Sequence, residues 1–394
     1  MKKFFLKCIM VISIGLIGLQ PIQAEEKVKE KDDLNLAENS KSAILIERDT
    51  GKILYEKSAH EVLPPASMTK IMTLLLIMEA LEEGQIKLDE TVRVSEHAAS
   101  MGGSQIFLEE GEEMSVKDLL KGVAIASGND ASVALAEHIA GSEKTFVKMM
   151  NDKVKKLGLE NTHFKNPTGL PAKDHYSTAY DMAVMAKALL KHEEITEYTS
   201  MYDGYLREGT EDEFWLVNTN KLVKFYDGVD GLKTGYTSEA KYCLTATAKK
   251  NNMRVITVAM GADTTKKRNS DVTEMLDYAF SQFATKKLFD SNQPVTNLEM
   301  IKAAKDKVRV VTDESISVVH KKGEKLENIE TKVKMKSDIV LPLKKGDKVG
   351  TLEVLKDNKL LSETQIVVEE DVDNASFWRL FKKSMDNMLK IEPS

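Results

Sequence analysis

The sequence predicts an α+β protein followed by a small all-β domain and a terminal amphipathic helix. Three observations support this fold class. Strand-like runs lie at both ends of the region 41–285, helical periodicity fills its middle, and β-branched residues alternate with charged ones in 286–372. The chain has 394 residues, 42% of them hydrophobic and only 8 of them proline, which is the composition of a folded protein of several domains.

The first 24 residues have the pattern of a secretory signal peptide. Three lysines precede the short apolar run Cys8–Leu19, and Ala24 supplies a small residue before the chain becomes charged. A membrane anchor that stays attached is the alternative. Cys8 lies inside the apolar run rather than at its exit, which disfavours a lipoprotein. We expect residues 25–40, which lack apolar periodicity, to be a flexible lead-in.

The region 41–285 is expected to form one sheet with helices packed against it. It begins with a β-hairpin, 43–47 and 53–55, around the turn signal Asp49-Thr50-Gly51. Helical patterns then continue to about Leu190. Three strand-like runs and an amphipathic helix follow, at 229–232, 242–248, 253–260 and 266–283.

The segment 286–372 reads as a small β-rich domain. Gly323, Gly346 and Gly350 mark turns between its short strand-like runs. It contains no cluster of His, Cys or Ser that would support catalysis, so we expect a spacer or a binding module.

The last segment, 373–394, is expected to be an amphipathic helix that lies in a membrane interface. Phe377, Phe381, Met385 and Met388 share one helical face, and lysines and an arginine surround it. The segment is too short and too charged to span a bilayer. The alternative is a helix that packs onto its own protein.

Composition excludes several classes of function. Lysine and arginine number 56 against 62 acidic residues, so no basic excess is available to neutralise a nucleic acid. Cys243 is the only cysteine after the signal region, so no intramolecular disulfide is expected, and its strand-like context favours a place in the core. The seven histidines form no His-Glu-x-x-His pattern, so the sequence predicts no metal site and no cofactor.

Ser67 and Lys70 form a candidate nucleophile pair. They precede 71–78, which is apolar nearly all round and predicts a buried helix. At this spacing the amine lies beside the hydroxyl, and a lysine whose pKa is lowered by burial or by a nearby cation can remove the hydroxyl proton. A Ser-x-x-Lys spacing also arises by chance, and Ser67 as a simple helix N-cap is the alternative.

Two further segments could complete a site. Ser127 and Asn129 follow a helix that Ser115 and Asp118 are expected to cap, so they lie in a tight connection that can present a hydroxyl and an amide together. An ordinary turn would use the same residues. The segment Lys233-Thr234-Gly235 lies on a strand, where a cation, a hydroxyl and a close backbone approach suit a peptide carboxylate. A solvent-exposed edge lysine is the alternative.

The ordered set of three segments resembles the signature of penicillin-binding proteins and serine β-lactamases. Over essentially the whole chain the sequence resembles the DacF-type D-alanyl-D-alanine carboxypeptidases among the low-molecular-weight penicillin-binding proteins. Phe164–Leu170 is similar to a further family segment beside the site. The resemblance implies a three-layer α/β/α catalytic domain with an antiparallel sheet.

The resemblance also implies residue roles. Ser67 would be the acylated nucleophile and Lys70 its base. Ser127 and Asn129 would form the facing wall of the cleft, with Ser127 relaying a proton to the leaving D-alanine.

On the opposite side of the cleft the implied residues bind substrate. Lys233 and Thr234 would hold the terminal carboxylate, and Gly235 would let the backbone come close. The N–H groups of Tyr236 and of the nucleophile would form the oxyanion hole. Arg268 would add positive field for the carboxylate.

The implied activity is removal of the terminal D-alanine from peptidoglycan stem pentapeptides, with acylation by β-lactam antibiotics. The implied location is the outer face of the cytoplasmic membrane, in the cell-wall space. A class A β-lactamase is disfavoured, because Glu160 is followed at the required spacing by Phe164 rather than by an asparagine. An endopeptidase that cuts cross-links and a non-catalytic penicillin-reactive or wall-binding protein stay open.

Overall fold

A computed structural model describes residues 34–389 of the chain. The predicted signal peptide and most of the predicted lead-in therefore lie outside the described residues. Residues 36–40 contradict the expectation of a flexible lead-in. Ala37 is fully buried, and the Ser40 hydroxyl donates a hydrogen bond of 2.5 Å to Asp271. The segment is ordered because it leads directly into a strand and packs beside the helix that carries Asp271.

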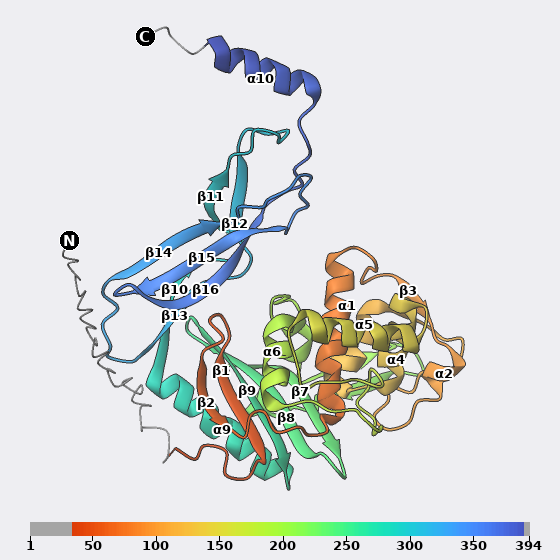
Figure 1. The fold of residues 1–394 in the computed structure, drawn as a ribbon. Coiled ribbons are helices and arrows are strands. Elements are labelled where there is room, and N and C mark those ends of the chain that lie inside the picture. The colour runs from red at the N-terminus through yellow and green to blue at the C-terminus, as the bar shows by residue number, and fades with distance from the viewer. Residues whose placement is uncertain (1–33, 390–394) are drawn as a thin grey trace, which may run out of the picture. The chain divides into compact units, whose positions relative to one another are not determined.

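The catalytic-region sheet is antiparallel and has the strand order β2-β1-β9-β8-β7 (Figure 1). Its strands are β1 (Ser42–Glu47), β2 (Ile53–Lys57), β7 (Val229–Thr237), β8 (Lys241–Lys250) and β9 (Met253–Ala262). Leu45 pairs with Tyr55 in β2 and with Thr257 in β9. The predicted hairpin and the sharing of one sheet by both ends of the region are thus confirmed.

Helices cover both faces of this sheet, which gives the expected three-layer α/β/α architecture. Side chains alternate between faces along β1. Ile44 and Ile46 belong to a core with α1 (Lys70–Glu82), α4 (Asn129–Ala140), α5 (Glu143–Lys156) and α6 (Ala179–Leu189). Ala43 and Leu45 belong to a second core with α9 (Thr265–Gln282).

The helical region contains short elements that place the site. Ser115 caps α3 as predicted, because its hydroxyl accepts the N–H of Asp118 at 3.1 Å. The short elements before α4 are η1 (Ala66–Thr69), β3 (Thr91–Arg93), α2 (Glu96–Ala99), β4 (Glu113–Ser115), α3 (Val116–Lys121) and η2 (Gly122–Ala126). Those after α6 are α7 (Ile195–Thr199), β5 (Asp203–Leu206), β6 (Phe214–Val217) and α8 (Leu222–Phe225).

The C-terminal part is a β domain with its own core, as predicted. A five-stranded sheet has the order β11-β12-β16-β15-β14, and β10 pairs with β13. The strands are β10 (Phe283–Phe289), β11 (Pro294–Leu298), β12 (Val308–Thr312), β13 (Ile316–Lys321), β14 (Ile329–Met335), β15 (Lys348–Lys356) and β16 (Lys359–Val368). The first strand begins directly after α9, a little earlier than the boundary at 286 that the sequence pattern indicates.

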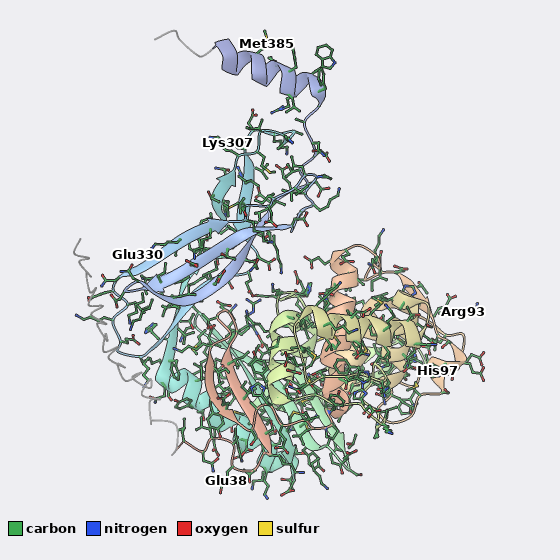
Figure 2. The ribbon with its side chains drawn as sticks, in the orientation of Figure 1. Glu38, Arg93, His97, Lys307, Glu330 and Met385 are labelled. Carbon is green, nitrogen blue, oxygen red and sulfur yellow. The ribbon has the colours of Figure 1, made fainter. Side chains whose placement is uncertain are left out.

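The terminal helix α10 spans Phe377–Leu389 and has exposed apolar side chains. Phe377 and Trp378 are 74% and 75% exposed, and Phe381 and Met385 are also exposed; Figure 2 labels Met385. Among residues 34–389, no helix is both long and apolar enough to cross a bilayer.

Candidate active site

Ser67 lies in the 3-10 turn η1, directly before the helix that the sequence predicts. The α-helix α1 begins only at Lys70. Because a 3-10 helix has three residues per turn, residues at i and i+3 eclipse each other. The Lys70 ammonium accordingly lies 3.4 Å from the Ser67 hydroxyl. Ala66, just before Ser67, has a left-handed φ of 49°, so the turn is held by its surroundings.

The Lys70 side chain is fully buried and its hydrogen-bond partners are neutral. The ammonium donates to Asn129 Oδ1 at 2.6 Å and to the Thr168 carbonyl at 2.8 Å. Burial lowers the pKa of Lys70 well below its usual value, Lys233 lowers it further, and Asp130 opposes the shift. The pKa shift expected from the sequence is therefore confirmed in direction, with burial as the main cause.

The second segment brings Asn129 to Lys70 and leaves Ser127 with an unpaired hydroxyl. Ser127 follows the irregular turn η2, has a left-handed φ of 65° and is 3% exposed. Its Oγ has no hydrogen-bond partner among the described residues. Asn129 is fixed at both ends of its amide, because Nδ2 donates to the Gly102 carbonyl at 2.6 Å while Oδ1 accepts from Lys70. A buried hydroxyl without a partner is available to a substrate.

Asp130 supports this segment, and sequence reasoning missed it. Its carboxylate accepts the N–H groups of Ile106 and Leu108 at 2.9 and 3.2 Å, which holds the 102–108 loop against α4. Burial raises the pKa of Asp130. An acidic residue directly after Asn129, at the start of an apolar helix, was the available signal.

The third segment lies on β7, at the edge of the sheet. Lys233 is 1% exposed, so the alternative of a solvent-exposed edge lysine is wrong. Its ammonium donates only to the Thr234 carbonyl, at 3.2 Å, among the described residues. Burial, and then Arg268, lower the pKa of Lys233 to about 7. The Thr234 hydroxyl donates to Thr219 Oγ1 at 2.8 Å, a contact that the sequence did not indicate.

Two glycines allow the backbone around Ser67 to be tightly enclosed. A Cβ on Gly235 would lie 2.8 Å from the Pro65 carbonyl oxygen, so β7 can approach η1 only with glycine there. The sequence analysis expected Gly235 to let the backbone approach a bound peptide, and the approach seen here is instead that of β7 to the turn that carries Ser67. Gly169 has φ +82°, and a Cβ on it would lie 1.8 Å from the Ala66 carbonyl oxygen.

The segment Phe164–Leu170 lies beside the site, as the resemblance implies. The carbonyl of Thr168 accepts from Lys70, and that of Pro167 accepts from the Thr73 hydroxyl at 2.7 Å. His175 fastens the same loop. Its Nδ1 accepts the Lys165 N–H, so the proton resides on Nε2, which lies 2.8 Å from the Thr69 hydroxyl. Burial lowers the pKa of His175 to about 4, so this ring is neutral near pH 7.

Arg268 and Tyr236 take different positions at the site. Arg268 lies in the first turn of α9, is buried, and donates to Asn269 Oδ1 and to the Cys243 carbonyl. Tyr236 is 54% exposed and its ring lies 4.5 Å from that of Tyr242. Cys243 is buried as predicted, and burial raises its pKa to about 11, which keeps the thiol protonated.

A family model described as D-alanyl-D-alanine carboxypeptidase matches residues 26–264. The chain belongs to this family. A second model, described as the C-terminal domain of penicillin-binding protein 5, matches residues 283–374. Between them the two matches cover the catalytic region up to the start of α9, and the β domain.

Relatives of the same family match nearly the whole chain. The D-alanyl-D-alanine carboxypeptidase DacF of Bacillus subtilis is 56% identical and covers 97% of this chain and 98% of its own. Penicillin binding protein 5 of Haemophilus influenzae has a similar structure, with a TM-score of 0.66, 32% identity, and coverage of 85% of this chain and 98% of its own. Penicillin-binding protein D2 of Listeria monocytogenes, solved in the ampicillin-bound form, has a TM-score of 0.57, 32% identity, and coverage of 63% and 100%.

The active site of this D-alanyl-D-alanine carboxypeptidase family member concentrates buried positive charge. Lys70, Lys233 and Arg268 are all buried, and none forms an ion pair with a carboxylate in the part of the chain that the structure describes. The same described residues contain no group of three or more His, Cys, Asp or Glu suited to hold a metal ion. The site therefore offers cationic donors for an anionic ligand.

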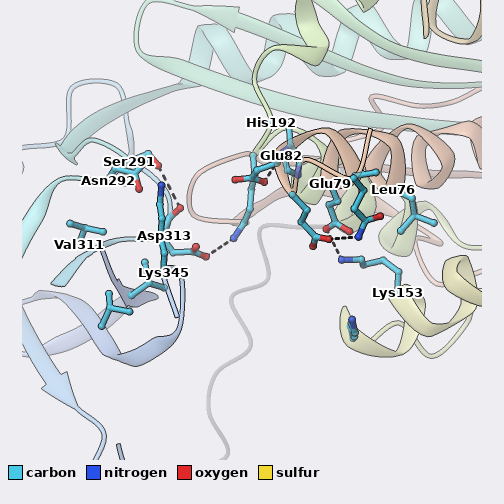
Figure 3. A pocket seen from close by; sticks show the side chains of 18 of the residues that line it. Leu76, Glu79, Glu82, Lys153, His192, Ser291, Asn292, Val311, Asp313 and Lys345 are labelled. Atoms are coloured by element: carbon cyan, nitrogen blue, oxygen red, sulfur yellow. Dashed lines mark hydrogen bonds and ion pairs between the residues drawn. The ribbon is translucent and has the colours of Figure 1, made fainter. Parts of the chain in front are cut away.

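Two cavities lie outside the cluster of predicted residues. One, of about 560 Å³, adjoins the nucleophile turn and is lined by Ala66, Gly169 and Thr237 among others. The other, of about 790 Å³, contains none of the predicted site residues (Figure 3). Several charged residues on its wall are paired with each other, as Lys153 is with Glu79 at 2.5 Å.

Proposed function

We propose that this chain is a serine-type D-alanyl-D-alanine carboxypeptidase that removes the terminal D-alanine of peptidoglycan stem pentapeptides. One observation carries the proposal. The buried Lys70 amine, whose pKa is well below its usual value, lies 3.4 Å from the Ser67 hydroxyl and contacts only neutral acceptors besides. A lowered pKa raises the fraction of the amine that is neutral, and the neutral amine can accept a proton from the serine.

In the first step, Ser67 Oγ attacks the carbonyl carbon between the two D-alanines while Lys70 takes the hydroxyl proton. The N–H groups of Ser67 and Tyr236 bind the oxygen that becomes negative. The unpaired hydroxyl of Ser127 gives its proton to the nitrogen of the departing amine and takes up the proton that Lys70 removed from Ser67, so that Lys70 is neutral again. The C–N bond breaks, free D-alanine leaves, and the shortened peptide stays attached to Ser67 as an ester.

In the second step, water attacks this ester. Lys70 receives the proton of the water and returns one to Ser67 Oγ as the C–O bond breaks. Asn129 keeps the amine in place through its 2.6 Å hydrogen bond. The cavity of about 560 Å³ beside Ala66 and Gly169 gives the acyl part of the peptide room next to the ester.

The substrate carboxylate meets the cations on the β7 side of the cleft. Lys233 and Thr234 bind it directly, and Gly235 lets the strand come close enough to do so. Arg268 strengthens the positive field through its position behind β8, where it already depresses the pKa of Lys233. A negative ligand relieves this repulsion, so binding of the carboxylate is favoured.

β-Lactam antibiotics acylate the same serine in this proposal, since their strained amide and carboxylate present the same two groups. The ampicillin-bound form of the Listeria relative supports this. The chain acts after export, at the outer face of the cytoplasmic membrane in the cell-wall space. The signal-peptide pattern of residues 1–24 and the exposed apolar side chains of α10 support this location.

The test combines intact mass after penicillin treatment with release of D-alanine from a peptide ending in D-Ala-D-Ala. The wild type and a Ser100→Ala control, which changes a serine outside the site, should gain one penicillin and release D-alanine. Ser67→Ala should do neither. Labelling without release would favour a penicillin-reactive sensor, and labelling of Ser67→Ala would contradict the proposal. Faster cleavage of a cross-linked dimer than of the pentapeptide would favour the endopeptidase.

A further inference from the structure

Two loops of the β domain expose large apolar side chains. Ile301 lies in the 299–307 loop between β11 and β12, and Val340 lies in the 336–347 loop between β14 and β15. Each is 75% exposed, as much as Trp378 in α10. Single exposed apolar side chains are common on protein surfaces, but several of them on one surface indicate an interaction site.

The strand register places both loops at the end of the sheet from which α10 leaves. β16 ends at Val368, beside Val310 of β12. The loops begin and end at this same edge, since Leu298 pairs with Val308 and Met335 pairs with Gly350.

Backbone contacts tie both loops to the segment that leads into α10. Ala303 bridges to Asn374, and Leu343 bridges to Val372. The first turn of the helix is held as well, because Arg379 pairs with Asp306 at 3.3 Å. The two loop tips and the start of α10 therefore belong to one continuous surface, which we call the helix-end surface: residues 299–307, 336–347 and 369–382.

Charged side chains of both signs accompany the apolar tips. Lys302, Lys336 and Lys345 are exposed, and no ion pair involving them occurs among the described residues. Several acidic groups nearby are already paired with lysines, as Glu299, Glu370 and Asp371 are. The surface as a whole has eight basic and eight acidic side chains, so its net charge is zero. The exposed apolar tips suit the headgroup region of a bilayer, and the lysines of the adjoining α10 favour an anionic one.

We propose that the helix-end surface docks on an anionic phospholipid bilayer, with Ile301 and Val340 inserted beside α10. This inference rests on the proposed membrane association of α10 and adds two insertion points to it. A single amphipathic helix contacts the membrane only along its own axis, which leaves the β domain free to rotate about that axis. Two loop tips at the same end of a rigid sheet add contacts outside that line and so fix the orientation of the β domain on the membrane.

The opposite end of the sheet supplies a matched control. Leu360 and Leu361 follow the β15–β16 turn and are 54% and 47% exposed. Figure 2 shows Lys307 at the helix-end surface and Glu330 at the far end of the domain. The two ends thus expose similar apolar side chains, and only one of them adjoins α10.

The first experiment places a fluorophore at each end. The exported full chain with Val340→Cys or Leu360→Cys is labelled with an environment-sensitive dye, and buried Cys243 is protected from the reagent. Vesicles of phosphatidylcholine with about one third phosphatidylglycerol are then added. The dye at 340 should shift to the blue while the dye at 360 should not. Equal shifts, or no shift at 340 on bound protein, would overturn the proposal.

The second experiment measures vesicle partitioning. The Ile301→Ser/Val340→Ser pair should lower the partition coefficient about tenfold. Leu360→Ser/Leu361→Ser should leave it unchanged, and all variants should release D-alanine from a soluble peptide at the wild-type rate. If Phe377→Ser/Phe381→Ser weakens binding but the loop pair does not, the loops are not inserted and only the helix binds. If the wild type does not bind vesicles, the membrane proposal for α10 fails as well. The loop pair could instead keep vesicle binding and lose either self-association or peptidoglycan binding. That result would overturn the membrane proposal and assign the surface to a second copy of the chain or to peptidoglycan, respectively.

Discussion

Lys70 and Lys233 are fully buried amines with neutral hydrogen-bond partners, and burial is the main cause of each lowered pKa. Their tasks in the proposed reaction are opposite. Lys70 must lose its proton to act as a base, whereas Lys233 must keep its proton to bind a carboxylate. The cleft therefore works over the pH range in which the first is neutral and the second is charged.

The pH dependence of kcat/KM should reflect the ionisation of both Lys70 and Lys233. The rate constant should rise with pH as Lys70 loses its proton and should fall above pH about 7, as Lys233 of the free enzyme loses its own. Steady-state D-alanine release across this range measures it. In Lys233→Arg the guanidinium stays charged, so the alkaline fall of the residual activity should move to higher pH. If the alkaline fall in kcat/KM stays at the same pH in Lys233→Arg, it belongs to a group other than Lys233.

At the level of elements, the nucleophile turn η1 is enclosed by β7 on one side and by the 163–175 loop on the other. Each approach requires a residue without a Cβ, Gly235 and Gly169 respectively. The turn therefore keeps its shape, including the left-handed Ala66, because two neighbouring segments leave it no alternative.

Gly169→Ala should slow acylation by penicillin about 100-fold, because the new Cβ must displace the Ala66 carbonyl and with it Ser67. The acylation rate constant and the melting temperature measure the effect. Gly158→Ala is the control, since Gly158 also has a positive φ, +70°, but open space around it. That variant should lose only about 1 kcal/mol of stability and keep the acylation rate. Equal acylation rates in the two variants would show that the Gly169 approach is not needed.

The elements were predicted where a pattern repeats along the chain. Alternation and turn residues predicted the β1–β2 hairpin, and apolar periodicity predicted α1 and α9. The contacts of Asp130, Thr219 and His175 could not be predicted in the same way, because their partners lie on other segments and no local spacing encodes them. The order of residues 36–40 escaped prediction for the same reason, since it depends on Asp271 in a distant helix.

At the scale of the whole molecule, buried cations without carboxylate partners reduce the free energy of unfolding. Lys233 has a folded-state pKa of about 7 against a usual value of 10.5. Between these values the unfolded chain binds one more proton than the folded chain, so the stability rises with pH. Below about pH 7 the buried Lys233 amine lowers the free energy of unfolding by its full amount. Above the unfolded-state pKa of the lysine this destabilisation disappears.

Lys233→Met should therefore raise the melting temperature while it abolishes D-alanine release. The gain should be roughly 4 kcal/mol near pH 7 and should shrink as the pH approaches the unfolded-state pKa. Calorimetry at several pH values measures it. Lys266→Met, at an exposed position of α9, should change neither stability nor its pH dependence. A lower melting temperature for Lys233→Met than for the wild type would contradict the assigned cost.

The pairing of β1 with β9 joins Leu45 to Thr257, so the central sheet closes only when most of the catalytic region is present. The predicted signal peptide is N-terminal, so we expect the N-terminal end of the chain to cross the membrane first. Ser67 therefore reaches the outer side of the membrane long before Lys233. Until β7 arrives, the Ser67 hydroxyl lacks the strand that completes the site. A chain that stops halfway through translocation is consequently inactive. Hydrolysis begins only outside the membrane, once β7, β8 and β9 have joined the sheet.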